Sequence, residues 1–392
     1  MRIYLDHNAG APLRPEVRAA IGRFLEADEG NPGSVHRSGQ RARRALEQAR
    51  AQVAALVAAA PREIVFTSGG TESNNLAIRG AIEARPARRR IVTSAIEHSS
   101  ILAPLEYLAC RGFDVVRVGC DREGRIDTAA VVAAVGADTA LVTLGLANAE
   151  VGTIQDLAAV APAAERAGAL FHIDAAQAAG RIAVRVAELG CDLLTLSGHK
   201  LGAPAGIGAL YVRQGVAFAP ATLGGPQEAG LRAGTPNLLG AVAFGAAAEA
   251  AQAHFGEEST RLAGLAERLL ERLVVAISGL RLNGPADASR RLANTLNLSF
   301  PGVLGESLLI ALDLEGVEVS MGSACAAGAV EPSHVLLAMG LGRDAARSSL
   351  RLSLGWNTSE TEVACAAGII PRVWRRVMAA EPERACGGEV RS

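Results

Sequence analysis

Short apolar runs rich in β-branched residues alternate with longer alanine-rich segments through the first two-thirds of the chain. The intervening segments, such as residues 71–84 and 156–168, have the apolar spacing of helices. This alternation predicts an α/β fold, with a mostly parallel sheet covered by helices on both faces. The last two runs follow each other closely, which predicts an antiparallel pair at one edge. Seven runs are strand candidates: residues 63–68, 90–96, 113–119, 140–148, 170–176, 191–197 and 206–212.

The pattern changes after a long helical segment that begins near Gly240 and runs to about Ile277. Residues 295–300, 316–320 and 349–355 alternate apolar with polar side chains, which predicts a sheet with one solvated face in a smaller α+β domain. A chain of 392 residues is long enough for two domains. We therefore expect a large cofactor-binding domain over residues 16–245, a small domain formed by residues 1–15 and 246–380, and a disordered tail over residues 381–392.

Charge and composition argue against several classes of protein. Lys and Arg number 39 against 40 for Asp and Glu, and aromatic residues make up only 3%, so no basic, aromatic surface for nucleic acid is expected. No apolar run reaches the ~18 residues that span a bilayer, and the N-terminal sequence lacks an apolar signal core. The six cysteines lack the paired spacing of a zinc site or a disulfide framework. We expect a cytoplasmic protein with no metal, membrane or nucleic-acid partner.

Two residues at the ends of strand candidates suggest an aldehyde cofactor. Lys200 follows the run 191–197 in a glycine-rich turn, and a lysine whose pKa is depressed can form a Schiff base. Asp174 ends the run 170–176, and the carboxyl ends of parallel strands are where such sheets bind ligands. A carboxylate there can keep the pyridine nitrogen of pyridoxal phosphate protonated. Taken singly, such a lysine is more often paired or directed to solvent, and such an aspartate more often caps a helix.

Five further residues lie in the same pattern. Thr71 follows two glycines and opens a helix, where it is either a phosphate ligand or an ordinary cap. His98 follows a strand candidate and could stack on a ring or be structural. Gln177 could reach the ring oxygen or face solvent, and Thr235 lies in a glycine-rich loop. Arg351 lies on a strand candidate of the small domain and suits a substrate carboxylate. Each signal is weak alone, and their order along one sheet is the specific signal.

Cys325 lies in the small-residue segment GSACAAG. Free cysteine most often packs as a small hydrophobe. On a loop of glycine and alanine it could instead be a nucleophile, for which the thiolate is the competent form.

With these motifs in place, the chain resembles the cysteine desulfurases of the iron–sulfur cluster assembly and nitrogen-fixation group, within the class V aminotransferase family of pyridoxal phosphate enzymes. The resemblance implies a fold type I enzyme and a homodimer. It also implies conversion of L-cysteine to L-alanine with a persulfide on Cys325, for transfer to a protein acceptor such as an iron–sulfur scaffold. The matching segments span nearly the whole chain: YLDHNAGAP, NPGSVHRSGQ, FTSGGTESNNLAI, EHSSIL, NAEVGTIQDL, HIDAAQAAG, LSGHKLGAPAGIGALYV, GLRAGTPN, GSACAAG and SLRLSLG.

The resemblance also implies a role for each matching residue. Lys200 would hold the cofactor covalently and remove the α-proton, Cys325 would attack the substrate sulfur, and Arg351 would bind the substrate carboxylate. His98 would stack on the ring and assist proton transfer, and Thr235 would reach the phosphate of the other subunit. The remaining cofactor contacts would be Asp174 at the pyridine nitrogen, Gln177 at the phenolate oxygen, and Gly70, Thr71, Ser197 and His199 at the phosphate.

The chain departs from the family pattern at several positions. Gly10 and Ala11 stand where two threonines are usual, and Ala149 stands where many relatives have an asparagine. Pro226 and Ala229 stand where glycine and arginine are usual. We expect activity to be retained, because Lys200, Asp174, Arg351 and Cys325 are all present. The alternatives are a selenocysteine lyase or aminotransferase on the same fold, or a non-catalytic sulfur-relay protein. The sequence does not identify the sulfur acceptor.

An arginine-rich segment spans residues 36–50 (HRSGQRARRALEQAR). Its pattern predicts a solvated helix face. A docking surface for an acidic partner is the alternative.

Overall fold

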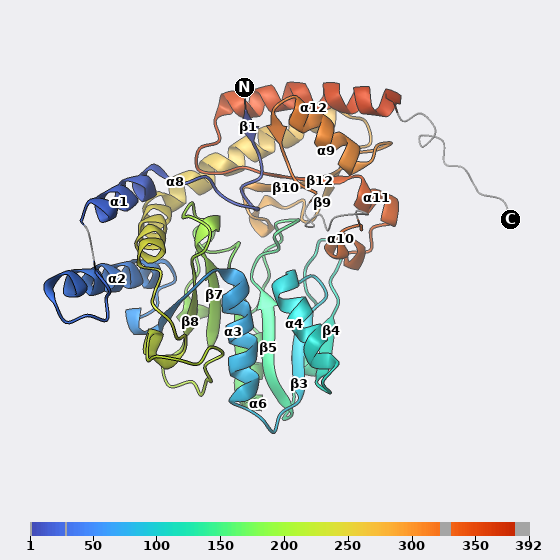
Figure 1. Cartoon of the computed structure of the whole chain (residues 1–392). Helices are drawn as coiled ribbons and strands as arrows, with labels where there is room; N and C mark the ends of the chain where they lie inside the picture. Colours follow the sequence, from blue (N-terminus) through green and yellow to red (C-terminus); the bar gives the residue numbers. More distant parts are fainter. Residues whose placement is uncertain (1, 28–29, 322–330, 381–392) are drawn as a thin grey trace.

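The computed structural model describes residues 2–27, 30–321 and 331–380 (Figure 1). Its main sheet has seven strands in the order β2-β8-β7-β6-β5-β3-β4, which confirms the predicted mostly parallel sheet. Apolar β-branched runs form most of these strands because side chains on both faces are buried under helices; the edge strand β4 is only partly buried. The strands are β2 (Ile64–Thr67), β3 (Arg90–Ser94), β4 (Asp114–Val118), β5 (Thr139–Gly145), β6 (Leu170–Asp174), β7 (Leu193–Ser197) and β8 (Gly208–Val212).

Strand β8 is antiparallel to its neighbour β7, as predicted, but it does not lie at the edge of the sheet. β2 pairs with the side of β8 that faces away from β7 and is the edge strand, with Ile64 opposite Tyr211. The expected edge position was wrong because this pairing joins segments far apart in the chain, which no local pattern reveals. β2 therefore runs parallel to β7. The carboxyl ends of β2, β3, β5, β6 and β7 meet at one edge of the sheet.

Helices cover both faces of this sheet (Figure 1). On one face α3 (Gly70–Glu83) and α4 (Ser99–Ala109) bury an aliphatic cluster that includes Leu76 and Leu105. The predicted helices at 71–84 and 156–168 correspond to α3 and α6. The other face is covered by α1 (Pro15–Glu26), α2 (Arg37–Leu56), α5 (Thr128–Ala134), α6 (Val160–Ala167), α7 (Val186–Leu189) and the first half of α8 (Leu238–Ala276).

A second hydrophobic cluster surrounds two smaller sheets. An antiparallel sheet has the order β12-β10-β9, and β1 pairs in parallel with β11. Helix α12 packs against α9 and the second half of α8 over this core (Figure 1). The elements are β1 (Ile3–Tyr4), β9 (Arg281–Asn283), β10 (Thr295–Ser299), α9 (Gly305–Leu314), β11 (Val317–Glu318), α10 (His334–Ala338), α11 (Arg343–Arg347), β12 (Ser349–Ser353) and α12 (Glu360–Ala380).

The predicted solvated face of this small sheet was wrong. Every residue of β10 and β12 is buried, polar ones included. The polar side chains face other parts of the protein: Asn297 donates to the carbonyl of Glu150 at 3.3 Å, and Asn8 donates to the Thr295 hydroxyl at 2.9 Å. Alternation of apolar and polar residues therefore marks a polar interface here, because these groups find partners in the protein rather than in water.

Helix α8 joins the two halves of the molecule, since Ala241 and Phe244 belong to the core of the large sheet and Leu265 and Leu269 to the second cluster. The division between residues 245 and 246 stays a prediction. The predicted tail over residues 381–392 lies outside the described residues. Within the described part of the chain, no helix combines the length and apolarity needed to cross a bilayer.

Candidate active site

Three of the predicted site residues lie at the carboxyl edge of the large sheet. Asp174 is the last residue of β6, and Lys200 ends a 3-10 turn directly after β7. His98 follows β3 and caps α4. Because the strands are parallel, their carboxyl ends bring residues from three separate segments to one edge of the sheet.

Lys200 carries the only lysine ε-amine in the 392-residue sequence. Its Nζ donates to the carbonyl oxygens of Asn8, at 2.5 Å, and Ala9, at 2.9 Å. Burial, together with nearby guanidinium groups, lowers the pKa of Lys200 to about 7. Near neutral pH a large share of this amine is therefore neutral and nucleophilic. The charges that act on it are Arg181 and Arg351, which lower its pKa, and Asp6 and Asp174, which raise it.

Asn74 holds the carboxylate of Asp174. Its Nδ2 donates to Asp174 Oδ2 at 2.8 Å and to the Ser100 hydroxyl at 2.8 Å, while the backbone N–H of Ala176 donates to Asp174 Oδ1 at 2.9 Å. The Oδ1 of Asn74 is buried and has no hydrogen-bond partner in the described structure. Sequence reasoning missed Asn74. The available signal was its spacing of one helical turn from Gly70, on the face of α3 that packs on the sheet.

His98 is held in a defined orientation by the start of α4. Its Nδ1 accepts from the backbone N–H of Ser100 at 3.1 Å and lies 2.7 Å from the Ser100 hydroxyl. Burial lowers the pKa of His98, the charges of Lys200 and His334 lower it further, and Asp174 opposes them. These effects favour the neutral imidazole, the form that can accept a proton.

A glycine-lined helix N-terminus lies beside the lysine turn. Gly69 has φ +153°, a conformation open to glycine, and a Cβ on Gly208 would lie 2.7 Å from the Gly69 backbone. Gly70 opens α3 next to Ser197, to whose Cβ its own Cβ would lie 3.5 Å away, and Thr71 follows on the surface. Ser197 Oγ lies 3.0 Å from the Nδ1 of His199, whose pKa is lowered to about 4 by burial and by Lys200. The exposed N–H groups of such a helix start suit an anion.

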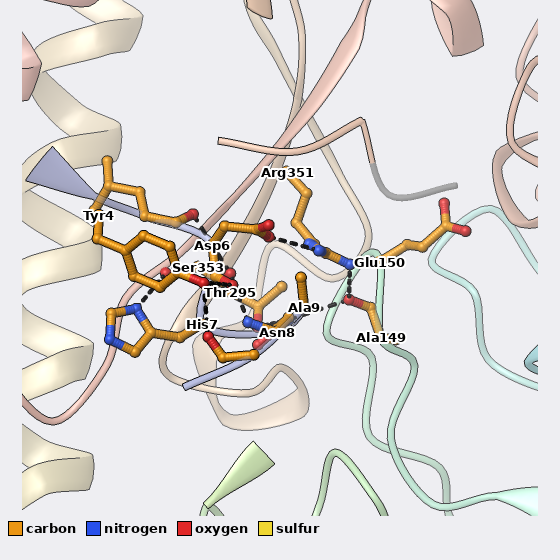
Figure 2. Close-up of polar contacts among 12 residues, drawn as sticks. Tyr4, Asp6, His7, Asn8, Ala9, Ala149, Glu150, Thr295, Arg351 and Ser353 are labelled. Atoms are coloured by element: carbon orange, nitrogen blue, oxygen red, sulfur yellow. Dashed lines mark hydrogen bonds and ion pairs between the residues drawn. The ribbon is translucent and has the colours of Figure 1, made fainter. Parts of the chain in front are cut away.

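Arg351 lies on β12 of the small sheet and contacts the N-terminal segment that also contacts Lys200 (Figure 2). Its Nη2 donates to Asp6 Oδ1 at 2.7 Å, and its Nη1 donates to the carbonyl of Ala149 at 3.2 Å. Its Nε is buried without a hydrogen-bond partner among the described residues. The Ala149 carbonyl also accepts from Asn8 Nδ2 at 3.1 Å, so the departure from asparagine at position 149 leaves these backbone contacts in place.

Gln177 and Asn148 are both held by neighbouring groups. The Nε2 of Gln177 donates to the Asn8 carbonyl at 3.0 Å, and its Oε1 accepts from Arg181. Asn148 instead supports its own turn: it donates to the carbonyl of Ile96 at 3.1 Å and accepts from the backbone N–H groups of Glu150 and Val151.

Two predicted residues are not placed with this group. Thr235 lies in an exposed loop before α8, and no hydrogen bond found in the described structure joins it to Lys200 or Asp174. Cys325 lies outside the described residues.

The loop that carries the departures at Pro226 and Ala229 is secured by a buried ion pair. Glu228 and Ala229 have φ values of 48° and 56°, which are strained for residues other than glycine. Both carboxylate oxygens of Glu228 accept from Arg50 of α2, at 2.6 and 2.8 Å, and Oε2 also accepts from the backbone N–H of Phe66 at 2.7 Å. Arg50 is thus the buried member of the arginine-rich helix, whereas Arg37, Arg43 and Arg44 are exposed.

Glu228→Gln is expected to lower the free energy of unfolding by about 3 kcal/mol, because it removes the buried carboxylate that pairs with the buried charge of Arg50 and leaves only the exposed Glu47 as its ionic partner. Glu47→Gln is the matched control: Glu47 pairs with the same arginine, but its side chain is 56% exposed, and its loss should cost less than about 1 kcal/mol. Chemical denaturation of the purified variants measures both. Equal stability of the two variants would contradict the assignment.

These groups fit pyridoxal phosphate. The cofactor requires an amine that is neutral near physiological pH, an anion at its ring nitrogen and a phosphate site. Lys200 supplies the amine, Asp174 with Asn74 supplies the anion, and the start of α3 supplies N–H donors beside Ser197.

Comparisons with known proteins agree with this fit. The family described as aminotransferase class-V matches residues 3–365. Cysteine desulfurase 2 of Trichormus variabilis is 43% identical over 380 residues, which cover 97% of this chain and 95% of the relative. A solved NifS-like protein superposes with a TM-score of 0.89 at 34% identity, over 96% of this chain and 100% of its own. The structure described as SspA in complex with cysteine has a TM-score of 0.79 at 34% identity, over 90% and 99%. The chain therefore belongs to the class-V aminotransferase family and is a pyridoxal-phosphate-dependent cysteine desulfurase.

Proposed function

We propose that the enzyme converts L-cysteine to L-alanine and retains the substrate sulfur as a persulfide on Cys325. The Cys325 thiolate attacks the substrate sulfur, so that an S–S bond forms while the C–S bond breaks. The electron pair of the broken bond stays on carbon, which takes up a proton, and alanine leaves. Atoms and electrons balance without an added oxidant or reductant. The solved relative with bound cysteine supports this substrate.

The observation that carries the proposal is the position of the sole lysine. Lys200 lies at the carboxyl edge of the sheet, bonded to Asn8 and Ala9, and Arg351 bonds to Asp6 of the same N-terminal segment. One short segment, residues 6–9, thus brings the only ε-amine next to a carboxylate-binding guanidinium. An amino acid needs both groups, one for its amine-bearing carbon and one for its carboxylate.

In the proposed site, Lys200 holds the cofactor, Asp174 pairs with the ring nitrogen and Gln177 donates to the ring oxygen. Bound pyridoxal phosphate supplies an electron sink for the substrate α-carbon. Gly70, Thr71, Ser197 and His199 hold the phosphate, and Thr235 of a second subunit completes it. The glycine geometry at Gly69 and the helix N-terminus of α3 support the phosphate assignment.

Lys200 and His98 are the proposed proton carriers. With a pKa of about 7, the Lys200 amine can take the α-proton and return it within one turnover. Burial lowers the pKa of His98 and favours its neutral form, which would stack on the bound cofactor ring and accept the proton of the substrate thiol. Arg351 is proposed to bind the substrate carboxylate, since among the described residues its Nε has no hydrogen-bond partner and its Nη2 donates only to Asp6.

A homodimer in the cytoplasm that passes sulfur to a protein acceptor, such as an iron–sulfur scaffold, completes the proposal. The exposed position of Thr235 supports a role at a neighbouring subunit. Cys110, Cys120, Cys191 and Cys365 are free thiols, which suits a reducing compartment.

The product and the site of the persulfide test the proposal. Purified enzyme is incubated with L-cysteine; alanine is quantified and each cysteine peptide is examined by mass spectrometry. We expect alanine, and one additional sulfur atom on the Cys325 peptide. Cys325→Ser should abolish the persulfide and keep the visible absorbance of the cofactor, whereas Cys110→Ser, at an exposed free thiol, should change neither. A keto acid product, or sulfur release by Cys325→Ser at the wild-type rate, would contradict the proposal. L-Selenocysteine in the same assay measures the preference between sulfur and selenium.

A further inference from the structure

Arg181 is a partly buried cation that the proposed reaction leaves without a task. Its Nη1 donates to Asn8 Oδ1 at 2.8 Å and to Gln177 Oε1, and its Nη2 lies 3.4 Å from the His7 carbonyl. All three acceptors are neutral, and no ion pair with a carboxylate involves Arg181 in the described part of the chain. Holding an uncompensated charge away from water is costly, so a purely structural arginine is a poor explanation.

Arg181 and Lys200 line the same small cavity of about 50 Å³. Glu258 also lines it, but both of its oxygens accept from Arg14 at 2.7 Å. The one carboxylate among the residues that line this cavity is thus already paired with Arg14, and it forms no ion pair with Arg181 in the described structure.

The hydrogen bonds of Arg181 converge on the groups that touch Lys200. The Asn8 carbonyl accepts from both Lys200 Nζ and Gln177 Nε2, and Arg181 holds the side-chain oxygens of both Asn8 and Gln177. Because the amide oxygen of Gln177 accepts from the guanidinium, its Nε2 faces the Asn8 carbonyl, the same oxygen that accepts from Lys200. A planar fork can hold two such oxygens at once, which a single ammonium group does less well.

We propose that Arg181 is a positioning residue of the desulfurase: its guanidinium orients the amides of Gln177 and Asn8 around Lys200 and keeps a second positive charge beside the lysine amine. The inference rests on the proposed roles of Lys200 and Gln177. It assigns no contact with substrate to Arg181.

The sign of the electrostatic effect follows from the charges around the lysine. A positive charge disfavours the ammonium form, so Arg181 lowers the pKa of Lys200 and favours the reactive amine. Removing the charge should raise that pKa. The other ionisable groups that interact with Lys200 are Arg351 with the same sign, Asp6 and Asp174 with the opposite sign, and the imidazoles of His98 and His199.

The chain offers a clean test because Lys200 is its only lysine. Trace acetylation of the cofactor-free enzyme with acetic anhydride, followed across pH by mass spectrometry, reports the pKa of Lys200, with the N-terminal amine as internal reference. We expect half-maximal labelling near pH 7 for the wild type. For Arg181→Met we expect a shift upward by about one pH unit, a tenfold loss of neutral amine at a given pH.

Three variants separate charge from orientation. Arg181→Lys should keep the pKa within about 0.3 units of wild type, yet bind pyridoxal phosphate more weakly in an absorbance titration, because it cannot hold both amides. Arg185→Met removes an exposed charge four residues away and should change neither quantity. Arg181→Gln repeats the neutral substitution with a polar side chain if the methionine variant does not fold.

Wild-type labelling behaviour in both neutral variants would overturn the inference, as would an equal shift in Arg185→Met. The labelling uses neither cysteine nor turnover. A failure of the persulfide assay at Cys325 would therefore not alter this result, and the two proposals fail separately.

Discussion

Lys200→Ala is expected to reduce desulfurase turnover by at least about 10⁴-fold, because in the proposed site this one side chain both attaches the cofactor and carries the proton. The substitution also produces a chain with no lysine at all. Cofactor added to this variant can bind through Asp174 and the start of α3, but it cannot be linked to the protein by borohydride reduction. In the wild type the same reduction should modify one peptide, the one that contains Lys200.

Lys200→Arg is the matched control for charge. It retains a cation at the end of β7, but arginine stays protonated at every working pH and cannot act as a nucleophile or base. We expect the arginine variant to be as inactive as the alanine variant while its thermal unfolding stays closer to wild type. If either variant turned over L-cysteine within tenfold of the wild type, Lys200 would not be the catalytic amine.

The large sheet could be predicted from the sequence because its signal is local. Apart from the edge strand β4, the strands are buried on both faces and therefore read as nearly continuous apolar runs. The position of β8 between β2 and β7 could not be predicted, since strand order depends on contacts between segments more than a hundred residues apart. The prediction of a solvated face on the small sheet was wrong for a related reason. The polar side chains of β10 and β12 contact groups around Glu150 and Asn8 rather than water.

In the candidate site, too, local features could be predicted from the sequence and long-range contacts could not. Lys200 and Asp174 could be assigned one by one, because strand ends and glycine-rich turns are visible in the sequence. The partners that tune them could not: Asn74 lies 100 residues from Asp174, and the Asn8 carbonyl lies 192 residues from Lys200. Arg181 gave no signal either, since an arginine after a short turn has no local feature that marks it as a neighbour of the catalytic amine.

The N-terminal segment, residues 6–9, contacts both Lys200 and Arg351; Figure 2 shows its contacts with Arg351 and with the small sheet. Asp6 bonds to Arg351, and Asn8 and Ala9 bond to Lys200 through their carbonyls. The same segment is fastened to β12, where the Ser353 hydroxyl accepts from the Asn8 backbone N–H at 2.9 Å. In the proposed site, residues 6–9 would therefore align the substrate carboxylate with the reactive amine, and they lie outside the strands of both sheets, with a single bridge from Asp6 to Ser353 of β12.

If Arg351 binds the substrate carboxylate as proposed, Arg351→Met is expected to raise KM for L-cysteine about hundredfold. Loss of a charge-assisted pair with the substrate carboxylate costs about 3 kcal/mol, which corresponds to that factor. The decisive measurement compares L-cysteine with cysteamine, which has the same amine and thiol but no carboxylate. The wild type should prefer L-cysteine strongly, and Arg351→Met should lose about the same hundredfold of that preference.

Two further variants serve as controls for the proposed role of Arg351. Arg351→Met leaves Asp6 without its cation, so the double variant Arg351→Met with Asp6→Asn removes both partners and should show the same loss of preference with better stability. Arg2→Met breaks another arginine–carboxylate pair of the N-terminal segment, with Glu318, but this pair is exposed and should leave KM unchanged. Undiminished preference for L-cysteine in Arg351→Met would show that another cation binds the substrate carboxylate. Arg181 could not replace it without releasing Gln177 and Asn8, so the labelling of Lys200 would then shift as well.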